Sequence, residues 1–202
     1  MAGAKQDMGS GSIKKLMVQM AVPALVGQII NLLYNIVDRI YIGHIPEIGG
    51  LALTGVGLFT PILMLITAFA MLAGSGGAPR AAIAMGQGNQ EKAEKIVANC
   101  FTVLLFLAVV LTAVFYVSMP TLLRFFGASD ATLPYGVKYA RIYILGSVFV
   151  LTVMGMNAFV TAQGFARVSM LTTVIGAAIN IILDPVFIFV FDMGVAGAAW
   201  AM

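Results

Sequence analysis

Two carboxylates, Asp38 and Asp184, stand inside long apolar stretches of the sequence. A charged side chain at the centre of a bilayer costs about 2.5–3.5 kcal/mol on insertion scales, so such residues are rare and usually serve a function. Burial favours the neutral form of a carboxyl group, which lets it take up a proton near neutral pH, and carboxylate oxygens also bind hard cations. The sequence therefore predicts a site for a proton or for a small cation such as Na⁺.

Amide side chains accompany both carboxylates. Asn31, Asn35 and Asp38 are spaced i, i+4 and i+7, which places them on one stripe of a helix. Asn180 precedes Asp184 by one helical turn, so these two also share a face. Amide oxygens add ligands of the kind that a hard cation prefers.

The two carboxylates are expected at a similar depth. Asp38 lies nine residues before the loop residue Glu47, and Asp184 lies eight residues before Asp192. At about 1.5 Å per residue, each carboxylate is roughly 12–14 Å below the same end of a helical bundle. Tyr139 falls at a comparable depth in its own helix, so its phenol is expected to join the site.

Each carboxylate also has a purely structural interpretation. Asp38 precedes Arg39, and the two could form an ion pair at the membrane interface. Asp184 precedes Pro185, which removes a backbone donor, so Asp184 could mark a local helix break capped by Asn180. The shared depth and the polar neighbours on both helices favour the cation site.

Long apolar helices must position these groups. Of the 202 residues, 61% are hydrophobic and 9% are charged, and the mean hydropathy is +1.02, whereas a soluble domain carries about 25% charged residues. Five apolar runs exceed the ~20 residues that cross a bilayer as a helix, and they lack the alternation of barrel strands. The expected fold class is all-α, a polytopic membrane bundle with five transmembrane helices and the start of a sixth. The expected spans are about 16–42, 51–78, 96–123, 135–163 and 168–191, with the sixth beginning at 195, in one transmembrane unit (13–202) that follows a flexible segment (1–12).

The distribution of basic residues predicts the orientation. An excess of Lys and Arg marks cytoplasmic loops. A cytoplasmic N-terminus places seven of the eleven basic residues inside: Lys5, Lys14, Lys15, Arg80, Lys92, Lys95 and Arg167. We therefore expect a multi-pass protein of the cell (inner) membrane.

The sequence contains no pattern typical of an enzyme. It has one His and one Cys, no Ser/His/Asp arrangement and no nucleotide-binding motif. Its net charge of +3 is not gathered into a basic patch that would indicate nucleic acid. Without an ATP site or any organic cofactor, transport by such a protein would draw on an ion gradient.

Four segments carry a family resemblance. Residues 23–26 (PALV) with 31–43 (NLLYNIVDRIYIG), 180–189 (NIILDPVFIF) and 194–201 (GVAGAAWA) resemble the first, fifth and sixth helices of multidrug and toxic compound extrusion (MATE) transporters. The polar stretch with Arg80, Gly86 and residues 88–93 resembles the loop between the second and third helices. The resemblance extends from Lys14 to the chain end and is nearest to the prokaryotic DinF-type branch.

The resemblance implies a secondary antiporter that exports amphipathic cationic drugs in exchange for H⁺ or Na⁺. It implies a cation site in the N-terminal lobe, and bending of the first helix near Pro23. The implied cation ligands are Asp38, Asn180 and Asp184, with Tyr139 and Asn157 as neighbours. We also expect a substrate cavity lined by Gln28, Asn31, Tyr34 and Asn35.

Members of the family have twelve helices in two lobes, so this chain is expected to be an N-terminal lobe that works with a missing C-terminal lobe or a second chain. Two alternatives stay open. One is a flippase for lipid-linked oligosaccharides, which is expected to have a cationic cavity for a pyrophosphate. The other is a truncated membrane protein that does not transport.

Overall fold

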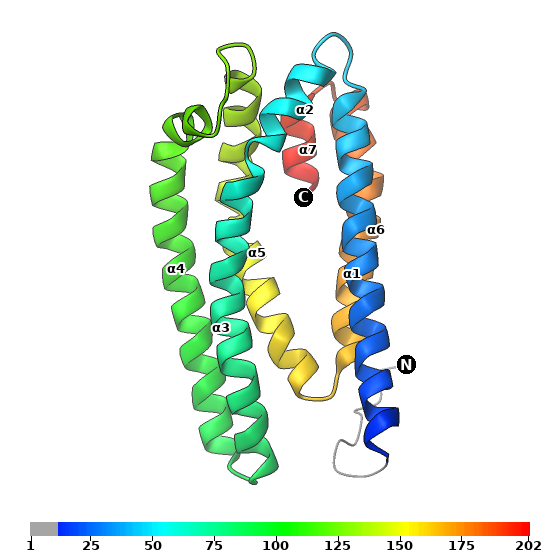
Figure 1. Cartoon of the computed structure of the whole chain (residues 1–202), viewed down its shortest axis with the longest axis vertical. Helices are drawn as coiled ribbons and strands as arrows, with labels where there is room; N and C mark the ends of the chain where they lie inside the picture. Colours follow the sequence, from blue (N-terminus) through cyan, green and yellow to red (C-terminus); the bar gives the residue numbers. More distant parts are fainter. Residues whose placement is uncertain (1–11) are drawn as a thin grey trace.

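The computed structural model describes residues 12–202, which form helices joined by short turns, with no strand in that range (Figure 1). Ser12 precedes the first helix, and the rest of the expected flexible segment lies outside the described residues. The helices are α1 (Ile13–Gly43), α2 (Gly49–Gly57), α3 (Thr60–Gly86), α4 (Gln90–Phe125), α5 (Leu133–Ala162), α6 (Ala166–Pro185), the π-helical turn η1 (Val186–Val190) and α7 (Val195–Ala201).

Five helical segments of the described chain are long and apolar enough to cross a membrane. They are Met17–Gly43, Gly49–Gly86, Gln90–Phe125, Leu133–Ala162 and Ala166–Val190. Large apolar side chains face outward along them, as with Val117 at 80% exposure and Phe149 at 75%. Such a surface is stable in lipid and not in water. The predicted fold class, an all-α membrane bundle, is confirmed.

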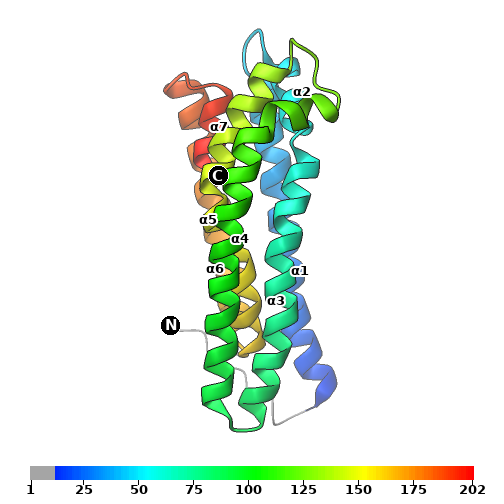
Figure 2. The ribbon, with the colours of Figure 1, turned by 90° about the vertical axis from the view of Figure 1, so that its left-hand side faces the viewer.

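The long helices fall into two groups (Figures 1 and 2). In one group α1 packs along α6, and in the other α3, α4 and α5 pack together. Helix α5 crosses from the second group toward the lower end of α6, to which a short turn joins it (Figure 1). The short helices α2 and α7 both pack against α5 near the upper end, so the two groups are held together there.

The apolar run expected at 51–78 is divided into two helices. Helix α2 ends at Gly57, and α3 begins at Thr60 after a turn at Leu58 and Phe59. Pro61 lies in the first turn of α3, where a helix does not use the backbone N–H that proline lacks. Hydropathy alone did not reveal this break, because both sides of it are equally apolar.

Helix α4 begins six residues before the run expected at 96–123, within the polar stretch that precedes it. The Asn89 side chain accepts a hydrogen bond from the Lys92 backbone N–H at 3.0 Å and so caps the first turn. Lys95 and Glu91 form an ion pair one turn apart, at 2.6 Å. These local interactions extend the helix beyond its apolar part.

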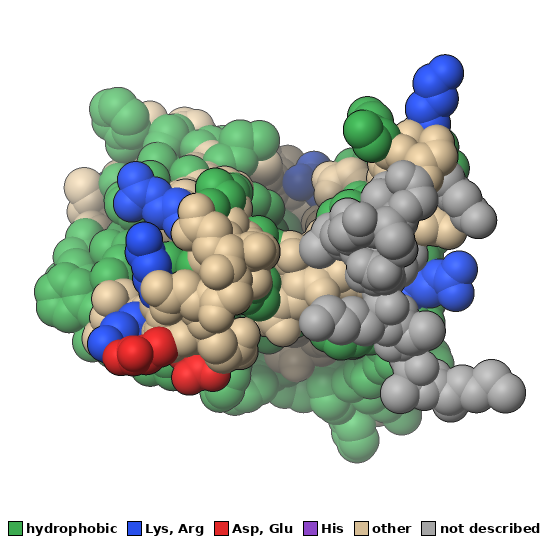
Figure 3. Space-filling view, turned by 90° about the horizontal axis from the view of Figure 1, so that it is seen from below, with side chains coloured by type: hydrophobic (Ala, Val, Ile, Leu, Met, Phe, Trp, Pro, Cys, Tyr) green, Lys and Arg blue, Asp and Glu red, His purple; other side chains and the backbone are tan. Residues whose placement is uncertain are grey.

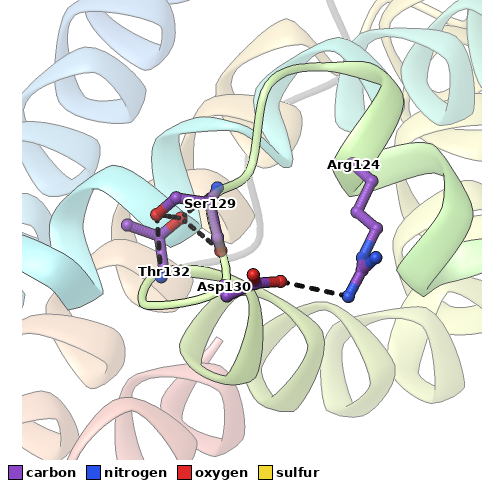
Figure 4. A network of polar contacts seen from close by, with 4 residues as sticks. All are labelled: Arg124, Ser129, Asp130 and Thr132. Carbon is purple, nitrogen blue, oxygen red and sulfur yellow. Dashed lines mark hydrogen bonds and ion pairs between the residues drawn. The ribbon is translucent and has the colours of Figure 1, made fainter.

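The turn between α4 and α5 is held by polar contacts (Figure 4). The Ser129 backbone N–H donates to Thr132 Oγ1 at 3.1 Å, and the Thr132 backbone N–H donates to Ser129 Oγ at 3.3 Å. Arg124 pairs with Asp130 at 3.2 Å across the same turn. The contacts between Ser129 and Thr132 therefore hold the turn that leads into α5.

Helices α2 and α5 cross in close contact at two glycines. A Cβ atom added to Gly55 would lie 2.7 Å from the Thr132 carbonyl oxygen and 2.8 Å from the Gly136 backbone nitrogen. Both obstructing atoms belong to the backbone, which cannot move aside as a flexible side chain can. The contact therefore requires a residue without a side chain at position 55.

We predict that Gly55→Ala lowers the thermal unfolding midpoint of the detergent-solubilised protein by about 3–10 °C, because overpacking costs about 1–3 kcal/mol. Gly50→Ala is the matched control on the same helix, since a Cβ atom at Gly50 meets nothing within 4 Å. Equal midpoints for the two variants would contradict the close crossing.

Candidate functional site

The structure brings Asp38, Asn180 and Asp184 together between α1 and α6. The three residues are 2%, 5% and 0% exposed. The carboxyl groups of Asp38 and Asp184 are close enough for their charges to repel, as expected if the two lie at one depth. Two adjacent buried carboxylates are not both stable in the charged form unless a proton or a cation joins them.

Three oxygens of this cluster have no hydrogen-bond partner among the described residues: Asp38 Oδ1, Asn180 Oδ1 and Asp184 Oδ2. Buried polar atoms are normally bonded, and an unsatisfied one costs about 1–3 kcal/mol. All three are acceptors, so what they lack is a donor or a positive charge. A proton shared by the two carboxyl groups would satisfy the two carboxylate oxygens. A small hard cation could be coordinated by all three oxygens.

The local backbone explains how Asp184 is presented. Pro185 cannot donate the hydrogen bond that would continue α6, and the chain passes into the π-helical turn η1. There the Phe191 backbone N–H donates to the Val186 carbonyl at 2.9 Å, a bond that spans five residues. Single π-helical turns inside helices occur frequently at functional sites.

Helix α1 is fixed to this turn by an aromatic contact. The rings of Tyr41 and Phe189 meet edge to face, with centroids 6.3 Å apart. Tyr41 lies three residues after Asp38, on the same side of α1. The contact therefore helps to direct Asp38 toward α6.

The ion pair between Asp38 and Arg39 is absent from the described part of the chain. Arg39 is exposed and its Nη2 donates to Thr60 Oγ1 at 3.3 Å, whereas Asp38 is buried. The second structural interpretation is present in part, because Asn180 Nδ2 donates to Asp184 Oδ1 at 3.3 Å. That bond leaves the other carboxylate oxygen of Asp184 without a partner, so it does not account for the site.

Tyr139 lies within electrostatic range of both carboxyl groups. Its hydroxyl donates to the Met202 sulfur at 3.0 Å, so the phenol is directed to the end of the chain and not to a carboxylate. Tyr143 was not among the residues predicted from the sequence, and its ring stacks on Tyr139 with centroids 6.2 Å apart. The one available signal was its position one helical turn after Tyr139.

A separate cavity of about 470 Å³ lies in the lower part of the molecule, between α1, α5 and α6. Among the predicted site residues, those that line it are Pro23, Gln28, Asn31, Tyr34 and Asn157. Asn157 therefore lines this cavity together with Tyr34, and its predicted place beside the carboxyl pair stays a prediction. Asn35 is not in the lining, and its amide donates to the Asn31 carbonyl at 2.7 Å and to Asn31 Oδ1 at 3.0 Å.

Solved structures of membrane transporters share this arrangement of helices. A MOP superfamily transporter from Pyrococcus furiosus superposes with a TM-score of 0.88 at 30% identity, over 98% of this chain and 44% of that one. A multidrug resistance MATE family transporter in an outward-facing conformation superposes with a TM-score of 0.87 at 31% identity, over 95% of this chain and 42% of that one.

The sequence comparisons agree. The MatE family model matches residues 23–186. The multidrug export protein MepA of Staphylococcus haemolyticus is 27% identical over 188 residues, which are 93% of this chain and 41% of that protein. The MepA protein of Staphylococcus aureus is 26% identical, over 92% of this chain and 41% of that protein.

These observations define the class as a multi-pass helical membrane protein of the transporter type. The chain belongs to the MATE family. The predicted resemblance is confirmed, and the relatives are transporters and not enzymes. The chain spans less than half the length of the curated relatives it matches, in agreement with a single lobe. The roles assigned to individual site residues stay predictions.

We predict that Na⁺, or a lower pH, raises the thermal unfolding midpoint of the protein, because either supplies the positive charge that the three oxygens lack. The Asp184→Asn variant should lose at least half of this stabilisation. Asp130→Asn makes the same chemical change at a carboxylate that is 94% exposed, and it should keep the full effect. Equal responses of both variants would place the ion elsewhere.

Proposed function

We propose that this chain is the cation-coupling lobe of a secondary antiporter that exports amphipathic cationic compounds in exchange for H⁺ or Na⁺. The observation that carries the proposal is the buried pair Asp38–Asp184, which together with Asn180 leaves three acceptor oxygens without a partner among the described residues. The multidrug export named for the MepA relatives supports the substrate class. Because the chain spans 41% of those relatives, a complete transport path requires a second lobe.

The chemistry of the site supports coupling. Without a bound proton or cation the two carboxylates repel each other. A bound proton or cation is attracted by both carboxylates, so it favours close packing of α1 against α6. A ligand shifts a conformational equilibrium only by its difference in affinity for the two states. The site supplies that difference, because its ligands come from two helices that move relative to each other only if the ion is released. Pro23 inside α1 is the proposed bending point.

The lining of the lower cavity supports a cationic and amphipathic substrate. Its polar side chains in the described chain are neutral amides, hydroxyls and the Tyr34 phenol, next to Met71, Met154 and Met170. Methionine adapts to varied apolar shapes, and an aromatic face attracts a cation. No Lys or Arg is among these lining residues, so the cavity does not have the cationic lining expected of a pyrophosphate flippase.

The charge distribution supports a cytoplasmic N-terminus in the cell membrane. The α3–α4 loop lies at the end of the bundle where α1 begins (Figures 1 and 2). Lys and Arg side chains gather on this end (Figure 3). Arg80 and Lys92 line a hollow there, close to the loop. A membrane end rich in these residues is normally cytoplasmic.

The test is efflux of a cationic dye by the complete protein in proteoliposomes, under an imposed gradient of H⁺ or of Na⁺. We expect Asp38→Asn and Asp184→Asn each to lower gradient-driven efflux at least tenfold. Each variant replaces a carboxylate with a neutral amide, which cannot take up and release a proton and has no negative charge to bind a cation. Asp130→Asn is the matched control and should transport normally. Comparison of the two gradients identifies the coupling ion.

Unchanged efflux in both site variants would overturn the carboxylate mechanism. Absence of flux in the unsubstituted complete protein under either gradient would overturn the antiporter itself and favour a membrane protein that does not transport. Efflux that responds to an anionic lipid-linked substrate and not to cationic dyes would favour the flippase.

A further inference from the structure

A groove runs along α3 and α4 at the end of the bundle that holds the loop between them. Two hollows of about 410 Å³ each adjoin there, and both are lined by Arg80 and Ile96. One extends to Gly76 and Gly77, and the other extends to Lys92 near the loop. We call this feature the α3–α4 groove. It shares no lining residue with the lower cavity or with the carboxyl pair.

The groove changes character along its length. Arg80 lies six residues before the end of α3 at Gly86, and Lys92 lies two residues after the start of α4 at Gln90. At 1.5 Å per residue, Lys92 is about 3 Å and Arg80 about 9 Å from the loop, whereas Gly76 is about 15 Å from it. The part near the loop is therefore cationic, and the part deeper along the membrane spans is uncharged, lined by Gly76, Gly77, Ile96, Cys100 and the neutral amide of Asn99.

The two cations of the groove have no ion-pair partner among residues 12–202. The ion pairs in that range join Lys95 to Glu91 and Arg124 to Asp130. Glu94 lines a hollow on the other side of α4, where its carboxylate accepts a hydrogen bond from Gln90 at 3.3 Å. No acidic side chain lines the groove, so its positive charge is complementary to an anionic ligand.

Gly76 leaves the deeper part of the groove open. A Cβ atom at Gly76 would meet no other atom within 4 Å. A Cβ atom at the adjacent Gly77 would lie 2.6 Å from the ring of Phe159, so Gly77 serves internal packing. The space over Gly76 is therefore available to a molecule from outside the chain.

We propose that the α3–α4 groove binds an anionic phospholipid of the adjoining leaflet. Its phosphate lies between Arg80 and Lys92, and an acyl chain follows the groove toward Gly76. Basic pockets between transmembrane helices bind anionic headgroups in this way. A zwitterionic lipid is disfavoured, because its amine would face the same two cations. The lipid site is inferred from the charge and shape of the groove, and it does not depend on the transport function proposed above.

The test compares phosphatidylglycerol with phosphatidylcholine, titrated into the detergent-solubilised complete protein. Bound lipid is counted by native mass spectrometry, and the thermal midpoint is followed in parallel. We expect phosphatidylglycerol to bind more tightly and to raise the midpoint more. Arg80→Gln and Lys92→Gln should each weaken its apparent affinity about fivefold, which is the contribution of one basic residue at an anionic surface.

Lys95→Gln is the matched control for charge. It removes one positive charge from the same helix, but the cation it removes is already paired with Glu91. Its affinity for phosphatidylglycerol should change less than twofold. Gly76→Leu tests the acyl chain, because its side chain enters the groove and its Cβ atom meets nothing within 4 Å. It should reduce lipid retention severalfold and leave the lipid-free midpoint unchanged.

Three results would overturn the proposal. Equal binding of the two lipids by the unsubstituted protein would show that the groove does not select an anion. Equal losses in Arg80→Gln and Lys95→Gln would show a general effect of net charge. Full stabilisation by glycerol phosphate alone, with retention unaffected by Gly76→Leu, would show a site for a free anion and not for a lipid.

Discussion

In hydrocarbon a backbone N–H or C=O group finds no water, so each membrane-spanning segment must satisfy these groups within its own helix. Two interruptions inside the spans of the described residues are each covered on one side by other parts of the protein. The turn between α2 and α3 contains Phe59, which is 1% exposed, and the π-helical turn after Pro185 contains Ile188, which is 2% exposed. Both interruptions lie near the polar cluster, because Phe59 packs on Tyr139 and Tyr143 while η1 begins two residues after Asp184. The covered breaks in the helices thus lie around the residues that face each other across α1 and α6.

The buried carboxyl groups of Asp38 and Asp184 are polar groups whose hydrogen bonds are not all satisfied within the described part of the protein. Burial with one oxygen of each carboxyl group unpartnered among the described residues makes Asp38 and Asp184 costly in the absence of a positive charge. This cost falls on the contact between two helices. An ion that relieves it therefore changes the preferred packing of α1 on α6. This is the physical basis on which we propose coupling. The aromatic contact of Tyr41 with Phe189 joins α1 to the turn that follows Pro185.

The opposite end of the bundle is built differently. Its core is small, with Ala78, Ala81 and Phe159 as the buried residues of a separate cluster. Hollows lie on both sides of α4 there, with Glu94 on one side and Lys92 on the other. Helices that pack less fully against each other leave surface for lipid. The proposed lipid site would thus complete a part of the molecule that its own side chains fill incompletely.

The sequence by itself determined the class of multi-pass membrane protein, the family resemblance and the two candidate carboxylates. A membrane requires long apolar helices, and a carboxylate inside such an apolar run is easily recognised in the sequence. It also predicted the common depth of Asp38 and Asp184, since helical rise is constant. Only the tertiary structure decided which polar residues meet. Asn157 lines the lower cavity and Asn35 bonds to Asn31, because the rotation of each helix against its neighbours is set by packing across helices. The break between α2 and α3 was hidden because both sides of it are equally apolar. The cationic groove was hidden because hydropathy along one helix contains no record of how the next helix packs against it.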